Sequence, residues 1–187
     1  VYTVGSNGAS RPKFRNIEDA LEALNNCGVD GPTTFLIAAG TYSAVTIGEI
    51  AGASHKNMIT FTSASGDSSD VIINGTYHLT LNGAKHVRFD RLTFGNKSGT
   101  RGVTFSGVCK DIEFYHCAIM MSANVTSSTY YAVYKPSGGT LDSIRVIGNH
   151  IHGGYYGMYF YGSGTANNGY NTNIIFDSNL VENQYYY

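Results

Sequence analysis

Tyrosine is the residue type with the strongest pattern in this sequence. Eleven of the 15 tyrosines follow residue 129, and the chain contains no tryptophan. A phenol ring combines a flat apolar face with a polar hydroxyl, which suits it to contact with sugar rings. Tyrosines that stack only to stabilise the fold are the alternative, and the strand phase places Tyr134 inward. We expect an outward-facing, substrate-binding platform of four residues: Tyr131, Lys135, Tyr159 and Tyr161.

Two histidines offer a second kind of chemistry. His150 and His152 alternate along one short apolar run, so both imidazoles leave a strand on the same face. Two imidazoles can begin a metal site, but a site needs at least a third ligand, and no third ligand follows the same pattern. The sequence therefore predicts surface histidines, with no metal and no cofactor.

A column of alternating charge is formed by Arg88, Glu113 and Arg145, which occupy equivalent places in successive repeats. We expect a solvated ion-pair ladder worth about 0–1 kcal/mol per pair, with contact to an acidic sugar as the alternative.

Catalytic residues are not predicted from the acidic side chains. Glycoside hydrolysis needs two carboxylates close together, whereas Asp67 and Asp70 lie in a loop and Asp177 is isolated at a bend. The outward column that begins at His78 and passes through Lys135 contains no acid. We therefore predict no lyase or hydrolase turnover by this chain.

The elements that hold these residues follow a repeat. One pattern of two apolar residues, a polar bend and a third apolar residue recurs in four segments: 86–94, 111–120, 143–152 and 173–182. Before each lies another short alternating run that ends near glycine: 78–83, 102–107, 131–139 and 157–164. Three strands per period without a helix between them predict stacked parallel strands. The expected fold is all-β, a right-handed parallel β-helix solenoid in one domain over 1–187, with a cap at about 1–30 and coils at about 31–187.

The polar bend itself has a predicted role. Asn149 and Asn179 occupy the same inward place in adjacent repeats, where their amides can bond to the backbone of the bend and to each other. Leu92 and Cys117 occupy that place in earlier repeats, so this asparagine ladder is expected only in the later ones. The expected inward residues are Val87, Phe89, Ile112, Phe114, Ile144, Val146, Ile174 and Phe176.

A helix is predicted near the start of the chain. Within 14–28, apolar residues fall on one helical face, Asn16 can cap the first turn with Asp19 at its third position, and Gly28 suits the end. Such a helix covers the first coil, whose core and strand edges need a lid.

A family resemblance accompanies these features. An asparagine ladder at a corner between short strands resembles the parallel β-helices of pectate and pectin lyases, polygalacturonases and pectin methylesterases. The segment 2–74, with "AAGTYS" and "NMITFTSASGD", resembles the opening of secreted β-helix proteins of the Bacteroidetes type, while the rest matches only as a repeat. The resemblance implies a right-handed helix that is secreted or on a cell surface.

Composition excludes several classes. The formal net charge of −1 gives no electrostatic reason for a nucleic-acid partner. No apolar run approaches 18 residues, so membrane insertion is not expected. Cys27, Cys109 and Cys117 lack metal spacing and are expected to be free. The sequence starts without a signal peptide and stops within a repeat, so we expect a fragment of a longer chain, truncated at its C-terminus.

Two classes of function remain open. The first is a non-catalytic, secreted or cell-surface β-helix segment that binds a polysaccharide, a surface glycan or a partner protein. The second is the N-terminal part of a polysaccharide lyase or glycoside hydrolase whose active site lies beyond Tyr187. A tailspike or adhesin-like stalk is a third alternative, and the sequence does not predict the oligomeric state.

Overall fold

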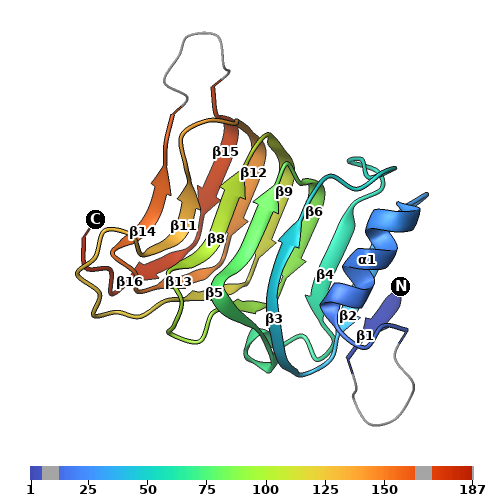
Figure 1. Cartoon of the computed structure of the whole chain (residues 1–187), viewed down its shortest axis with the longest axis horizontal. Helices are drawn as coiled ribbons and strands as arrows, with labels where there is room; N and C mark the ends of the chain where they lie inside the picture. Colours follow the sequence, from blue (N-terminus) through green and yellow to red (C-terminus); the bar gives the residue numbers. More distant parts are fainter. Residues whose placement is uncertain (6–12, 163–169, 187) are drawn as a thin grey trace.

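The architecture is known from a computed structural model that describes residues 1–5, 13–162 and 170–186. Within these ranges the elements are β-strands, one α-helix and one short 3₁₀ helix, η1 (Ser68–Asp70). Every strand pair within these ranges is parallel, which agrees with the predicted all-β, parallel arrangement (Figure 1). The glycine content is high and the proline content low, as a chain with many turns and continuous strand pairing requires.

One sheet contains seven strands, each supplied by a different turn of the chain. In spatial order they are β1 (Tyr2–Val4), β2 (Thr33–Ile37), β4 (Ile59–Ser63), β6 (Lys85–Asp90), β9 (Cys109–Tyr115), β12 (Leu141–Ile147) and β15 (Thr172–Asp177). Chain order and spatial order coincide, so each pass of the chain adds one strand beside the previous one.

The second sheet bends into two faces because its long strand β5 (Val71–Asn82) pairs with different neighbours along its length. Beside its first half lie β7 (Thr93–Phe94), β10 (Ala118–Met120), β13 (His150–His152) and β16 (Leu180–Glu182). Beside its second half lie β8 (Arg101–Ser106), β11 (Tyr131–Lys135) and β14 (Tyr156–Phe160), and β3 (Gly40–Ile47) pairs with both halves.

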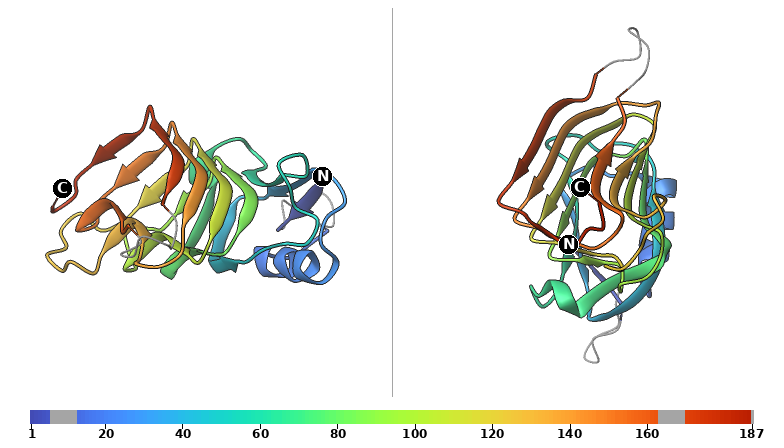
Figure 2. Two further views of the ribbon diagram at one scale, coloured as in Figure 1. Left: turned by 90° about the horizontal axis from the view of Figure 1, so that it is seen from above. Right: turned by 90° about the vertical axis from the view of Figure 1, so that its left-hand side faces the viewer.

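Equivalent residues of successive repeats are hydrogen-bonded neighbours. Ile112, Ile144 and Ile174 form one such row, and Ala118 pairs with His150 in another. Figure 2 shows the strands of each face lying over one another when the molecule is viewed along the stack. This arrangement is compatible with the predicted β-helix.

The corners of the repeat are made by residues with left-handed backbone conformation. Positive φ values occur at one corner at His86, Asp111, Ser143 and Asn173, and at the next corner at Arg91, His116, Gly148 and Ser178. Most of these are not glycine, so each corner carries a local steric cost that the surrounding strands offset. Ser178 explains the polar triplet of residues 177–179, because the chain bends there between β15 and β16.

The predicted asparagine ladder is present. The Asn149 side chain accepts a hydrogen bond from the Cys117 amide (2.8 Å) and donates to the Phe114 carbonyl (3.0 Å). The side-chain oxygen of Asn179 lies 2.8 Å from the Asn149 amide and 2.9 Å from its side-chain nitrogen, and Asn179 donates to the Val146 carbonyl. Asn149 is buried and Asn179 is half-buried, so the ladder links three successive repeats.

The core contains a column of aromatic rings. Phe35, Phe61, Phe89 and Phe114 stack in successive repeats at centroid separations of 5.0, 5.9 and 5.0 Å. Six of the predicted inward residues, from Val87 to Val146, are buried. Ile174 and Phe176 share the inward face, because the register pairs them with Ile144 and Val146. Ile174 is nevertheless half-buried and Phe176 is 42% exposed, because both lie on β15, the outermost strand of its sheet.

The predicted cap is helix α1 (Ile17–Cys27), beside the first strands of the stack. Asn16 accepts a hydrogen bond from the Asp19 amide (2.7 Å), and the Gly28 amide donates to the Leu24 carbonyl, as the sequence predicts. The helix buries its apolar face, formed by Ile17, Ala20, Leu21 and Leu24. No helix in the described ranges is long and apolar enough to cross a membrane.

The three cysteines are free, as predicted. Cys27 is exposed, whereas Cys109 and Cys117 are buried. Burial raises the pKa of the Cys117 thiol to about 12, so this residue is an inert part of the core.

Candidate functional site

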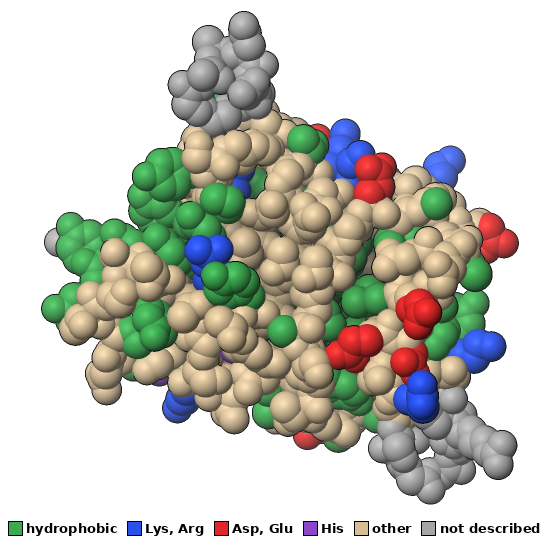
Figure 3. All heavy atoms as spheres, in the orientation of Figure 1, with side chains coloured by type: hydrophobic (Ala, Val, Ile, Leu, Met, Phe, Trp, Pro, Cys, Tyr) green, Lys and Arg blue, Asp and Glu red, His purple; other side chains and the backbone are tan. Residues whose placement is uncertain are grey.

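The tyrosine-rich surface lies on strands β11 and β14, which are hydrogen-bonded neighbours. Their register places Tyr131 beside Tyr156 and Tyr134 beside Tyr159. Tyr161 follows β14 directly and is exposed. Hydrophobic side chains gather over this region in the space-filling view, on the left of Figure 3, where β11 and β14 lie in Figure 1. We call the following five residues the tyrosine face: Tyr131, Tyr134, Tyr156, Tyr159 and Tyr161.

Contacts between neighbouring rings make this face continuous. Tyr131 stacks on Tyr134 and on Tyr156, with centroid separations of 4.2 and 5.4 Å. Tyr159 lies 4.8 Å from Tyr156 and 5.3 Å from Tyr161. Four of these tyrosines are half-buried by their neighbours, and none belongs to the buried core: Tyr131, Tyr134, Tyr156 and Tyr159. The arrangement fixes the rings with little remaining side-chain freedom, which lowers the entropic cost of binding a ligand.

Arginine, and not lysine, is the cationic residue of this face. The guanidinium carbon of Arg101 lies 4.7 Å from the ring centroid of Tyr134 and 4.7 Å from that of Tyr77. Arg101 pairs with Tyr131 across β8 and β11. The sequence reasoning missed Arg101 because its role depends on this cross-strand register.

A polar group without a partner lies at the same place. Thr104 pairs with Tyr134 in the strand register and is 5% exposed. Its hydroxyl oxygen is buried and has no hydrogen-bond partner among the described residues. Unsatisfied buried hydroxyls are uncommon in folded proteins.

The phenols of the tyrosine face are neutral hydrogen-bonding groups. A hydrogen bond with Tyr161, together with burial, raises the pKa of Tyr159. Burial and the neighbouring phenols raise the pKa of Tyr131. Both hydroxyls therefore stay protonated in neutral solution and can donate as well as accept hydrogen bonds.

The prediction for Lys135 is wrong. This residue is 1% exposed, and its ammonium group donates to the carbonyl oxygens of Pro136 (3.1 Å), Gly138 (3.0 Å) and Tyr161 (2.9 Å). Burial lowers the pKa of Lys135. Its register partner is Phe160, a residue that packs against the core. Lys135 therefore closes a corner of the fold and is not available to a ligand.

The prediction that Tyr134 points inward is also wrong. Tyr134 pairs with Thr104 and Tyr159, so it shares the outer face with them. Ala132 and Val133 are both buried, so the in–out alternation of β11 is interrupted there, and the residues that follow lie on the face opposite to the one that strict alternation predicts. Of the four predicted binding residues, the structure brings Tyr131, Tyr159 and Tyr161 together and leaves Lys135 out.

His78 was also expected on the outer column, and this prediction is wrong. The residue is fully buried, its Nδ1 accepts a hydrogen bond from the Gly75 amide (3.1 Å), and its Nε2 lies 3.0 Å from the Ser98 carbonyl oxygen. These two contacts select the neutral tautomer with a proton on Nε2. Burial lowers the pKa of His78, although the Ser98 contact acts in the opposite direction.

Acidification is expected to destabilise the protein through His78. The folded-state pKa lies below the ordinary value of 6.5, so the unfolded chain binds a proton first as the pH falls. Stability is therefore fully present above pH 6.5 and is lost below it, at up to about 1.4 kcal/mol per pH unit, until the folded-state pKa is reached. Thermal unfolding followed by circular dichroism between pH 8 and 5 measures this effect.

His78→Gln is the matched control, because a glutamine amide can accept from Gly75 and donate to Ser98 without titrating. Its unfolding midpoint should change less than that of the wild type over the same pH range. Equal pH dependence of the two proteins would contradict the assignment.

The charged column on the first sheet is the predicted ion-pair ladder. Arg88 donates to Glu113 at 2.6 Å, and Arg145 lies 3.3 Å from the other carboxylate oxygen. Glu113 is only 4% exposed, however, because the two arginines cover it. The ladder is therefore less solvated than predicted, and its central carboxylate carries two positive partners.

A second carboxylate beside this ladder holds two histidines, which sequence reasoning did not bring together. Asp111 Oδ2 lies 3.0 Å from the Nδ1 atoms of both His55 and His86, and Oδ1 lies 3.5 Å from Arg145. Burial raises the pKa of Asp111 and the hydrogen bonds from His86 and His55 lower it, with a net downward shift. This carboxylate is therefore ionised and orients imidazoles, a role that does not require catalysis.

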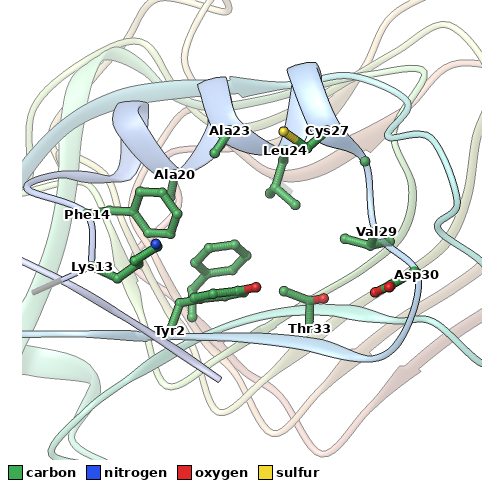
Figure 4. A pocket seen from close by; sticks show the side chains of 12 residues that line it. Tyr2, Lys13, Phe14, Ala20, Ala23, Leu24, Cys27, Val29, Asp30 and Thr33 are labelled. Carbon is green, nitrogen blue, oxygen red and sulfur yellow. The ribbon is translucent and has the colours of Figure 1, made fainter.

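A separate cavity lies beneath helix α1, at the opposite end of the molecule from the tyrosine face. Its volume is about 390 Å³. Figure 4 shows Leu24 and Cys27 of the helix on one side and Tyr2 on the other, with Lys13 and Asp30 toward its two ends. Its lining is mainly apolar, as expected where a cap packs on the first strands.

Comparison with known proteins gives no relative for this chain: no family model, no curated protein and no solved structure matches it. The resemblance to pectin lyase-like proteins therefore rests on the repeat and on the residues that the sequence itself supplies.

Proposed function

We propose that the chain is a segment of a secreted or cell-surface protein with a right-handed parallel β-helix fold of the pectin lyase-like kind. In this proposal the tyrosine face binds a polysaccharide or surface glycan, and the segment itself is not catalytic. Stacked strands provide a rigid scaffold, and the side chains of two neighbouring repeats form the binding surface.

The observation that carries the proposal is the continuous set of five tyrosine rings outside the core. Rings that serve only to fill the interior would be buried, as Phe89 and Phe114 are. The tyrosine face instead contacts solvent on the outer side of β11 and β14. Aromatic surfaces of this kind bury the apolar faces of sugar rings while their hydroxyls bond to the sugar hydroxyls.

Arg101 supports the same proposal. Arg101 offers a positive charge next to Tyr134, so an acidic sugar has a counter-charge at the edge of the face.

Replacing Tyr159 with alanine is expected to weaken polysaccharide binding by about 2–12-fold, since an aromatic contact contributes about 0.5–1.5 kcal/mol. Tyr159 is the test position because it contacts Tyr131, Tyr156 and Tyr161. Affinity electrophoresis in gels that contain pectin, alginate or a neutral glucan measures the change. Arg101→Gln should weaken binding to the uronate polymers more than binding to the neutral glucan.

Tyr170→Ala is the matched control, because this tyrosine is 79% exposed and has no place in the tyrosine face. Equal migration of Tyr159→Ala and Tyr170→Ala would contradict the proposed site. Release of unsaturated products or reducing ends, assayed with and without calcium, would favour the lyase or hydrolase alternative. Binding without turnover supports the non-catalytic proposal.

A further inference from the structure

A group of three potential metal ligands spans strands β13 and β16. His150 Nε2 lies 2.9 Å and His152 Nδ1 lies 3.5 Å from Glu182 Oε1. The three ligand atoms all lie within 4.8 Å of one another. No other group of three His, Cys, Asp or Glu side chains in the described ranges meets this condition.

The strand geometry explains why these side chains converge. Ile151 is fully buried, so the residues on either side of it, His150 and His152, leave the strand on the opposite, outer face. The register pairs His152 with Glu182 of the next repeat. The sequence pattern therefore revealed two ligands, and the missing third ligand comes from a residue 30 positions later.

We infer that His150, His152 and Glu182 form a binding site for a divalent transition-metal ion of the zinc type. Imidazole nitrogen and carboxylate oxygen are ligands that Zn²⁺ accepts, in a tetrahedral site with a fourth position for water. Ligand bonds of about 2.0–2.2 Å in that geometry separate neighbouring donor atoms by about 3.3–3.5 Å. The present separations of 2.9 and 3.5 Å need little movement to reach those values.

The charges around the site favour a cation. Glu182 forms its ion pairs with two imidazoles, those of His150 and His152. A metal ion can take the place of these two contacts, because the neutral imidazoles and the carboxylate can all bind to it. The carboxylate of Asp111 also contacts two imidazoles, but it has Arg145 beside it, and that fixed positive charge opposes metal binding. Asn183 Nδ2 lies 3.2 Å from His152 Nδ1, so this amide has to turn away from the nitrogen when a metal ion binds there.

The consequence of metal binding is a link between two repeats. The ion would join β13 to β16, which are otherwise held by only a short register of backbone pairs. Because the ligands come together only in the folded chain, binding would raise the unfolding temperature. This inference is independent of the proposed glycan site, which lies on β11 and β14.

Calorimetric titration of Zn²⁺ into the tag-free protein tests the site. All proteins carry Cys27→Ser, because an exposed thiol also binds zinc. We expect one zinc ion per chain, a raised unfolding midpoint, and no comparable binding of Mg²⁺, which prefers oxygen ligands. His152→Gln and Glu182→Gln should each weaken zinc binding by at least about tenfold and abolish the rise in midpoint.

His116→Gln is the control, because this imidazole is exposed and pairs with Asp90 at another corner. It should leave zinc affinity unchanged. Absence of zinc binding to the parent protein, or equal affinity of the parent and Glu182→Gln, would overturn the inference. Visible absorption of bound Co²⁺ gives a second readout, and tetrahedral bands that vanish in His152→Gln would support it.

Discussion

Replacing Phe114 with alanine is expected to lower the free energy of unfolding by about 3–5 kcal/mol. This ring is 1% exposed and lies at the junction of two aromatic groups in the core. It stacks on Phe89 at a centroid separation of 5.0 Å and meets the edges of Phe94 and Phe105 at 5.9 and 6.4 Å. Removing it leaves a cavity that the surrounding strands cannot close, because their backbone pairs hold them in place. Urea denaturation followed by circular dichroism measures the loss.

Phe176 provides a matched control within the same column. Both Phe114 and Phe176 pair with Val146, one from each side. Phe176 is 42% exposed, so its truncation removes less buried surface and should cost much less than the Phe114 change. Equal losses of unfolding free energy at the two positions would show that Phe114 is not part of a packed core.

Asn149→Leu is expected to cost about 2–6 kcal/mol. The substitution leaves the Cys117 amide and the Phe114 carbonyl without their side-chain partner, and each buried unsatisfied group costs about 1–3 kcal/mol. Leucine has a similar volume, so the result reports hydrogen bonding more than packing. The measurement is again urea unfolding, with the dependence on urea concentration compared between variants.

The same change at Asn179 should cost less, about 1–3 kcal/mol, because Asn179 is half-buried and water can replace some of its contacts. Leu92 occupies the equivalent place in an earlier repeat, so leucine itself fits the corner. If Asn149→Leu were as stable as the wild type, the hydrogen bonds of the ladder would make no net contribution to the free energy of unfolding, and the asparagines would contribute only by packing.

The sequence predicts the features that depend on local periodicity. Apolar alternation, the Asn16 cap and the inward Asn149 each follow from residue types within one repeat, and the structure contains all three. The parallel arrangement follows from the recurrence of the same pattern along the chain. These features are robust because many residues carry the same signal.

Features that depend on how the repeats align are harder to predict from the sequence than features within one repeat. The side of the strand on which Lys135 and Tyr134 lie changes with a one-residue shift, and the sequence of that repeat contains no marker for the shift. Glu182 and Arg101 gain their neighbours only through pairing with other repeats. The burial of Glu113 depends on two arginines in adjacent repeats, which a strand pattern does not reveal.

The parallel register has a mechanical consequence. Hydrogen bonds between strands of successive repeats run along the stack, so a pulling force along this direction loads the junctions between repeats in series. The weakest junction then sets the breaking force of the whole molecule. In this structure the junction with the fewest backbone pairs joins β1 to β2, which share three register positions, whereas β12 and β15 share five and β13 and β16 share three more. Rupture should therefore begin there and proceed one repeat at a time, as stepwise lengthening under tension.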